Sequence, residues 1–223
     1  MRKYLLLLAA FGFLAANSVK ATEYGFDKAH SHIGFSVKHI LSKVPGEFKD
    51  YDGSFTFDPA HPEKSKVNVT IQASSINTDN EMRDHHLQSA DFFNVQKFPT
   101  LTFVSKKVTK SDGDNKYKLE GDLTIHGVTK PVTLDVEYLG SDIMPMDKEG
   151  KVTANIAGFS ATTTIDRRDF GLNMSMVMPS GNLMVGNGVN ITLDIAAMDK
   201  ASLKKQAEMM EKMKKDKPAA PKN

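Results

Sequence analysis

The sequence has 223 residues, of which 25% are charged and 40% hydrophobic, and it contains no Cys. Without Cys there are no disulfides, so a hydrophobic core has to supply the stability of the fold. Residues 22–198 hold 18 basic and 23 acidic residues, a net charge of −5, whereas residues 199–223 hold eight basic and four acidic ones. This mildly acidic body argues against nucleic acid as the main partner.

Residues 1–21 have the pattern of a secretory signal peptide. Arg2 and Lys3 precede an apolar run of about 12 residues that ends at Ala16, too short for a membrane span of about 20. Ala21 is the small residue expected at the cleavage site. We therefore expect a mature protein that starts near Thr22 and is soluble in an oxidising compartment, and the alternative is a buried N-terminal helix.

Apolar and polar residues alternate in about eight segments of the mature chain, a pattern that predicts β-strands. Turn sequences such as Asp58-Pro59 and Glu149-Gly150 separate them. Strands that are each apolar on one face favour one domain, a closed antiparallel barrel or a sandwich. The segments lie around residues 33–37, 55–57, 67–71, 101–103, 117–125, 132–138, 152–165 and 189–195.

The apolar faces of these strands are rich in Phe, Ile, Val and Leu, contain no Trp and include few charges. An eight-stranded barrel can be filled by its own side chains or can enclose one small ligand. The composition favours a hollow interior but leaves both forms open.

Residues 76–105 are the one long polar and aromatic interruption of this β pattern. Residues 80–90 are mostly helix-forming, and two adjacent phenylalanines follow before Pro99 opens the next strand. The order predicts a short helix and an aromatic plug that close or gate one end of the barrel. The candidate lid or plug residues are Met82, Leu87, Phe92 and Phe93.

Residues 199–223 differ in character from the barrel segments. Leu203, Ala207 and Met210 recur at helical spacing among Lys and Glu, and prolines from Pro218 onward end the pattern. We expect a Lys-rich amphipathic helix followed by a disordered tail. The helix is either solvated, makes weak contact with an acidic membrane surface, or binds a partner.

The sequence contains no strong catalytic or metal-binding motif. His30 and His32 would share one face of a strand, but there is no HExxH, no GxSxG and no phosphate-binding loop. We therefore expect no catalytic residues, no metal and no cofactor. Four methionines between Met174 and Met184 suit adaptable packing, a lipid-facing rim or a copper-binding loop.

Four blocks of sequence occur in a recognisable order and spacing. They are DKAHSHIGFSVKHI with VPGEFKDYDGSFTFD, then SINTDNEMRDHHLQSADFFNVQKFPTLTFVS, then YKLEGDLTIHGVTKPVTLDVEY, and finally RRDFGLN with VGNGVNITLDI. Together they resemble the YceI-like polyisoprenoid-binding proteins over nearly all of residues 22–197. The loop at residues 141–151 and the chain after residue 198 are not part of this resemblance.

The resemblance implies an all-β, eight-stranded antiparallel lipocalin-like barrel spanning residues 22–198, with a short helical insertion and a C-terminal helix and tail. It implies a periplasmic carrier, monomeric or homodimeric, and no catalysis. The ligand would be a polyisoprenoid or quinone, with a fatty acid or amide as the alternative. The rival hypotheses are an enzyme or His/Met metal-binding protein on the same barrel, and an envelope stress factor with a solid core.

The resemblance also suggests which residues meet the ligand. Pro45, Gly46 and Phe48 would shape the first bend of the barrel. Arg83, His85 and Arg168, with Asp84, would meet the head group. The candidate wall residues of the tube are Ile33, Phe35, Val37, Val69, Ile71, Phe103, Leu123, Ile125, Leu134 and Val136.

Overall fold

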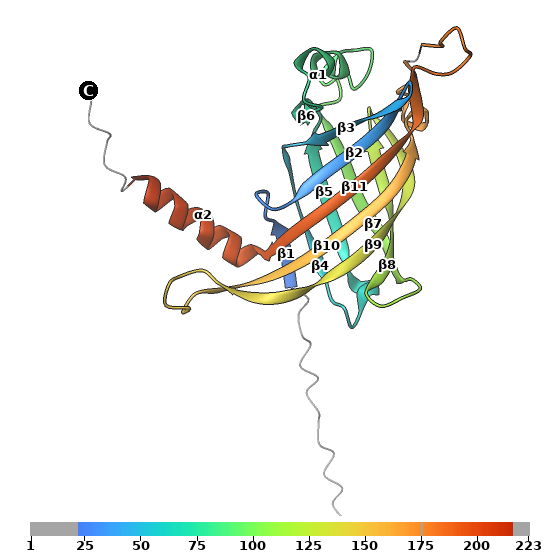
Figure 1. The fold of residues 1–223 in the computed structure, drawn as a ribbon. Helices are drawn as coiled ribbons and strands as arrows, with labels where there is room; N and C mark the ends of the chain where they lie inside the picture. Colours follow the sequence, from blue (N-terminus) through green and yellow to red (C-terminus); the bar gives the residue numbers. More distant parts are fainter. Residues whose placement is uncertain (1–21, 175, 216–223) are drawn as a thin grey trace, which may run out of the picture.

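An eight-stranded antiparallel barrel forms the body of the protein in a computed structural model that describes residues 22–174 and 176–215 (Figure 1). This confirms the predicted fold class. The predicted signal segment, residues 1–21, and the predicted tail at residues 216–223 lie outside the described residues.

The strands and α-helices have the following bounds. The strands are β1 (Thr22–Phe26), β2 (His32–His39), β3 (Ser42–Phe48), β4 (Tyr51–Phe57), β5 (Lys66–Gln72), β6 (Ile76–Asn77), β7 (Thr100–Lys110), β8 (Lys116–Ile125), β9 (Val128–Pro145), β10 (Thr153–Asp166) and β11 (Val185–Asp199), and the helices are α1 (Glu81–Gln88) and α2 (Lys200–Lys215). Three short 3₁₀ segments, η1 (Pro62–Lys64), η2 (Ala73–Ser75) and η3 (Arg167–Phe170), link them.

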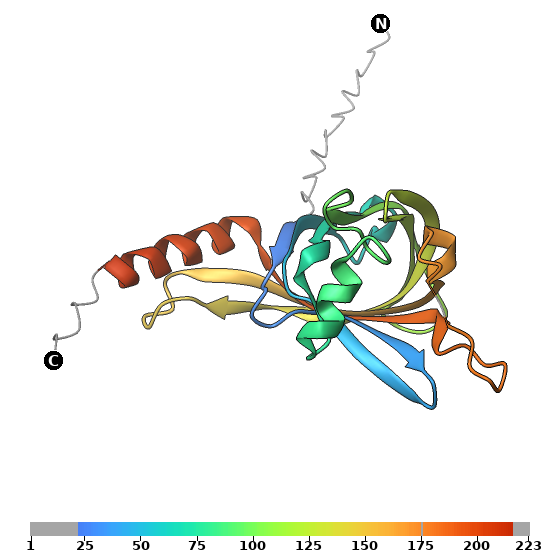
Figure 2. The same cartoon turned by 90° about the horizontal axis from the view of Figure 1, so that it is seen from above.

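The barrel wall runs in the order β1, β4, β5, β7, β8, β9, β10 and β11, and β11 returns to β1. Strand β11 pairs with two strands, because its residues 197–199 face β1 and its residues 185–194 face β2. Strand β1 therefore closes the barrel at one end, which we call the floor. The end that carries α1 is the mouth, and there the β2–β3 hairpin projects away from the ring of strands (Figure 2).

Alternation of side chains along the strands places the core inside the barrel. In β8, Tyr117, Leu119, Leu123 and Ile125 are all buried, whereas the polar residues between them are more exposed. Because successive strand residues point to opposite faces, one apolar row of each strand faces the interior. The predicted strands are found where the alternation placed them.

Three strands of the structure, β1, β3 and the two-residue β6, were not predicted. The expected bend at Pro45 and Gly46 is wrong, because both residues lie inside β3. Proline is tolerated here because the outer side of β3 is nearly a free edge, paired with β6 only through Glu47 and Phe48.

The predicted helix in the interruption is α1, at the mouth of the barrel (Figure 1). Asn80 is its N-cap, and its side chain accepts a hydrogen bond from the Arg83 amide at 3.0 Å. No residue of α1 is buried. Packing alone therefore does not fix this helix, and polar contacts to its neighbours hold it.

Helix α2 begins at the floor end, directly after β11. The Asp199 carboxylate accepts hydrogen bonds from the amides of Ser202, at 2.9 Å, and Asn155, at 2.8 Å. Burial raises the pKa of Asp199, but these hydrogen bonds outweigh it and hold the pKa below its ordinary value. Leu203 lies over Gly25 of β1, so the first turns of α2 are docked on the outer wall of the barrel.

Within the part of the chain that the structure describes, neither helix is both long enough and apolar enough to cross a membrane.

Candidate functional site

The barrel encloses an apolar cavity of about 520 Å³. Inward-facing residues of all eight barrel strands line it, together with β2, β3 and the α1 segment. Its volume lies within the range of about 300–1,000 Å³ that is usual for small-molecule sites. A barrel with a solid core does not fit this observation.

Aromatic rings close the floor of the cavity. Phe159 lies at their centre, with ring centroids 5.3 Å from Phe55, 5.1 Å from Phe57 and 5.3 Å from Tyr138. Tyr117 packs edge-on against Phe57, and burial raises the pKa of its hydroxyl. Rings in such edge-to-face contact favour one another beyond the area they bury, so the cluster makes a firm base.

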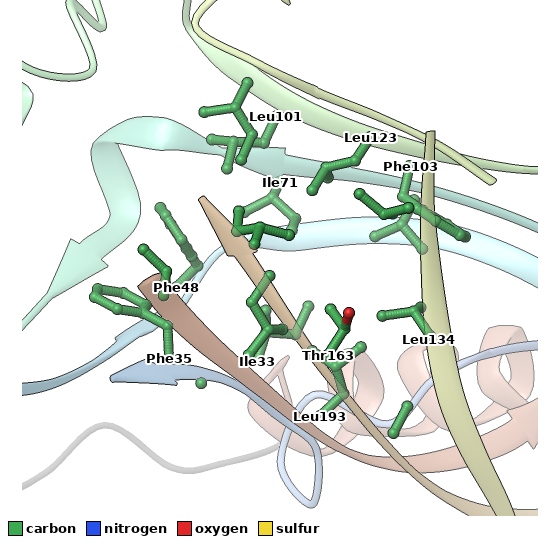
Figure 3. A pocket seen from close by; sticks show the side chains of 18 of the residues that line it. Ile33, Phe35, Phe48, Ile71, Leu101, Phe103, Leu123, Leu134, Thr163 and Leu193 are labelled. Carbon is green, nitrogen blue, oxygen red and sulfur yellow. The ribbon is translucent and has the colours of Figure 1, made fainter. Parts of the chain in front are cut away.

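The middle of the cavity is a wall of aliphatic and aromatic side chains. Figure 3 shows Ile71, Leu101, Leu123 and Phe103 facing Ile33 and Leu193 across the interior. All ten predicted wall residues line the cavity. They are Ile33, Phe35, Val37, Val69, Ile71, Phe103, Leu123, Ile125, Leu134 and Val136. That they contact a ligand stays a prediction.

A row of aromatic rings leads from β2 to the lid at the mouth. Phe35 lies 5.7 Å from Phe48, and Phe48 lies 5.9 Å from Phe93 (centroid distances). The Phe35 ring crosses Gly46 so closely that a Cβ at Gly46 would come within 2.3 Å of it. The lid residues Leu87, Phe92 and Phe93 also line the cavity, so the insertion does cover part of its mouth.

A polar network anchors the lid. The Arg83 side chain donates from Nε to the Thr78 hydroxyl, at 2.7 Å, and from Nη2 to the Thr78 carbonyl, at 2.6 Å. The Asp84 carboxylate accepts from the amide and hydroxyl of Thr78. Arg83 and Asp84, both expected to meet the head group, thus contact Thr78 instead of each other, and Arg83 borders the cavity while it holds the lid.

Three predicted ligand-binding residues do not reach the cavity. Met82 is 84% exposed and His85 is also exposed, because both lie on the outer side of α1. Arg168 points outward and pairs with Asp166 at 2.6 Å. The Arg168 guanidinium holds the pKa of Asp166 at about 2, well below its ordinary value.

Besides Arg83, a second arginine borders the cavity, Arg167, which we did not predict. It is only 4% exposed and borders the cavity near the mouth. Its guanidinium donates to the carbonyls of Gly186, at 2.9 Å, and Leu172, and to the Asn187 side chain, at 3.3 Å. Burial lowers its pKa from the ordinary value, although Asp166 opposes this. Arg167 thus joins η3 to the start of β11 and places positive charge beside the mouth.

Other lining residues came from outside the predicted set. Thr163 turns the one oxygen drawn in Figure 3 toward the interior. Met174, Met176 and Met184 border the mouth, which fits the lipid-facing rim that we considered for the methionine-rich loop. Their alternation with polar residues could have signalled this from the sequence.

Several histidines pair with carboxylates. His30 Nδ1 lies 2.7 Å from Asp27, and His61 Nδ1 lies 3.0 Å from Asp58. Among the described residues, no three His, Asp or Glu side chains gather as a metal site would require.

A closed-floor antiparallel barrel around an apolar cavity defines the lipocalin-like class of barrels. The family model "YceI-like domain" matches residues 24–197. The chain belongs to this family.

Three relatives place the chain further. A UPF0312 protein of Pectobacterium carotovorum is 44% identical over 180 residues, which cover 79% of this chain and 90% of that protein. The crystal structure of a Campylobacter jejuni YceI protein is 35% identical, covers 90% of this chain and 99% of its own, and has a TM-score of 0.60. A polyisoprenoid binding domain from Saccharophagus degradans is 14% identical, covers 81% and 99%, and has a TM-score of 0.54, a likeness of fold alone.

Proposed function

We propose that this protein is a periplasmic carrier that encloses the long apolar tail of an amphiphile in its barrel. The main observation that supports this proposal is a cavity with an aromatic floor and walls that present almost no polar surface. Each CH₂ moved from water into such walls contributes roughly 0.8 kcal/mol. A long tail therefore binds firmly without any specific polar contact.

We propose a polyisoprenoid, such as an isoprenoid quinone, as the ligand. The resemblance to polyisoprenoid-binding proteins supports this class, and one fold neighbour is named for it. Its polar head would stay at the mouth, beside the positive charges of Arg83 and Arg167. A fatty acid or amide remains the competing ligand, and the identity of the bound molecule separates the two.

We propose binding and not catalysis as the role of the cavity. The side chains that face it are apolar for most of its length, and the two arginines at its mouth are already engaged by hydrogen bonds. Such a lining holds and releases a tail, and it offers no nucleophile with an aligned base.

Native mass spectrometry of the mature protein purified from the bacterial periplasm tests the carrier role. We expect a bound lipid of one mass class that organic extraction identifies as a polyisoprenoid. An apo mass that persists after incubation with quinones and fatty acids would overturn the proposal. Recovery of the protein in the cytoplasm with residues 1–21 intact would overturn the location.

A pair of variants on adjacent residues of β10 tests whether the tail occupies the cavity. Thr163→Phe fills the interior, and we expect bound lipid to fall about 10-fold or more because several CH₂ groups lose their place. Thr162→Phe makes the same change on the outer, exposed face and should leave lipid content unchanged. Equal lipid in both variants would place the ligand elsewhere.

A further inference from the structure

Apolar side chains gather in water on two hairpin tips at the mouth. The β2–β3 turn carries Ile40, 37% exposed, and Leu41, 95% exposed. The loop before β11 carries Met176, 52% exposed, Val177, 67% exposed, and Leu183, 37% exposed. We call these five residues the mouth rim, and monomeric proteins rarely leave such a group of apolar side chains exposed without a binding role.

Hydrogen bonds join the two tips into one surface. The Ile40 amide donates to the Met184 carbonyl at 2.8 Å, and Val177 and Leu183 form a bridge across the second hairpin. Both tips lie on the same side of the mouth in Figures 1 and 2. The mouth rim is therefore one continuous surface.

The mouth rim continues into the cavity. Met176 belongs to both, since it is exposed and also borders the cavity. Met174, Met184 and Val44 extend the same apolar surface inward. A tail that moves between the cavity and the rim thus meets apolar side chains all the way.

The backbone at Ile40 indicates that its side chain serves more than folding. His39 pairs with Ser42, so Ile40 and Leu41 form a two-residue turn, and Ile40 has φ of +53°. Glycine and Asn adopt this region readily, whereas a β-branched residue is strained there. A turn that keeps two large apolar residues in water, one of them strained, is built for contact with something apolar.

The charge of the mouth rim differs from that of the barrel. Residues 33–46 contain Lys38 and Lys43 and no Asp or Glu, and residues 170–193 contain no charged residue at all. Lys38 and Lys43 face each other across the hairpin and are exposed. The mouth rim is thus neutral to positive on a body with a net charge of −5.

We propose that the mouth rim docks on the surface of an anionic lipid bilayer, with Leu41 and Val177 inserted among the acyl chains. The inference rests on the proposed function, because docking there would let a tail pass between bilayer and cavity without crossing water. Exposed apolar residues flanked by Lys are the pattern of interfacial membrane contact.

The observations favour a bilayer over a second copy of the chain. A symmetric dimer through the mouth rim would bring the lysines of both copies, Lys38 and Lys43, to one interface, where like charges repel. An anionic bilayer instead attracts both lysines and repels the acidic body. It would therefore orient the protein with its mouth toward the lipid.

Vesicle flotation of the mature full-length protein tests the docking. We expect binding to vesicles that contain phosphatidylglycerol and weaker binding to pure phosphatidylcholine. Leu41→Asp should weaken binding about 10-fold or more, because it removes an inserted side chain and adds a charge. Ile143→Asp is the matched control, since Ile143 is 63% exposed but lies on β9 beyond the floor.

Ile40→Gly separates docking from folding. Glycine relieves the positive φ, so the variant should be at least as stable as the original protein in urea and should still bind vesicles more weakly. Equal vesicle binding by Leu41→Asp, Ile143→Asp and the original protein would overturn the proposal. Loss of binding only in the double variant Lys204→Glu/Lys205→Glu would also overturn it, because that result would place the contact on α2. A third contradicting result would be original protein that does not bind vesicles but forms a dimer, which Leu41→Asp dissociates.

Native mass spectrometry of the same samples keeps the two proposals apart. If the Leu41→Asp variant still carries lipid but no longer floats with vesicles, docking is supported and the carrier role stands. If the original protein floats with vesicles in a way that depends on Leu41 but carries no lipid, docking is supported and the carrier role is overturned.

Discussion

At the floor of the barrel, aromatic rings from five strands pack against one another, whereas at the mouth three rings form a single row and apolar side chains remain in water. Most floor rings pack against two or three others, so they contribute mainly to stability. The mouth rings make fewer ring contacts and lie against the lid, so they contribute mainly to holding what lies inside. The comparison separates residues that keep the barrel folded from residues that serve its contents.

Replacing one ring at each end tests this separation, and it has the largest expected effect. Phe159→Ala should lower the free energy of unfolding by about 3–5 kcal/mol, because it leaves a void among three rings. Phe93→Ala, its counterpart at the mouth, should cost only about 1 kcal/mol, since Phe93 makes one ring contact and faces the cavity. Urea unfolding measures both, and equal losses would remove the distinction between the ends.

A substitution beneath the row of mouth rings should have an intermediate effect. Gly46→Ala places a Cβ 2.3 Å from the Phe35 ring and forces that ring toward Phe48. We expect a loss of about 1–3 kcal/mol and faster release of bound lipid. Gly188→Ala is the control, since its nearest neighbour would lie at 3.8 Å. Similar stability of the two variants in thermal unfolding would show that the close contact between Gly46 and Phe35 does not limit stability.

The cap at Asp199 should matter less than either ring system. Asp199→Ala removes the acceptor for two backbone amides, and we expect a loss of about 1 kcal/mol with faster hydrogen exchange in α2. Asp199→Asn can still accept a hydrogen bond and should keep most of the stability. Unchanged exchange in α2 after Asp199→Ala would mean that Leu203 alone docks the helix.

Acid should have the smallest effect, through Asp166 at the mouth. Its pKa is about 2 in the folded protein and about 4 when unfolded, so its contribution is present above pH 5 and is lost as the pH falls toward 2. We expect the stability difference between the original protein and Asp166→Asn to shrink over this interval in urea titrations. A difference that does not depend on pH would show that the pair with Arg168 adds nothing.

Much of the wall could be predicted from the sequence, because alternation fixes which side chains of a strand face inward. Alternation marked the apolar rows, and the family resemblance assigned Ile33, Phe35 and Leu123 to the wall of the tube; all three border the cavity. Alternation does not tell whether inward side chains pack against other core side chains or line a cavity, since this depends on the shape of the closed barrel. The cavity itself therefore had to come from the structure.

Positions near element ends were the hardest to predict. Arg167 and Arg168 are adjacent, and the 3₁₀ turn after β10 sends one inward and the other into solvent. On α1, a hydrophobic Met82 points outward while the polar Arg83 turns to the barrel. Helix-forming composition predicts the helix, but hydrogen bonds to Thr78 set its rotation. The short strand β3 was not predicted, because the proline and glycine inside it are typical of a turn.

The seam between β1 and β11 has a mechanical consequence. It consists of three facing residue pairs, and its last residue, Asp199, is also the cap of α2. A pull on the C-terminal helix is therefore transmitted straight to one of the two shortest joints in the wall, since β1 and β4 also meet through three pairs. We expect that under load the barrel opens first at this joint, where the force enters, while the other strand pairs still hold.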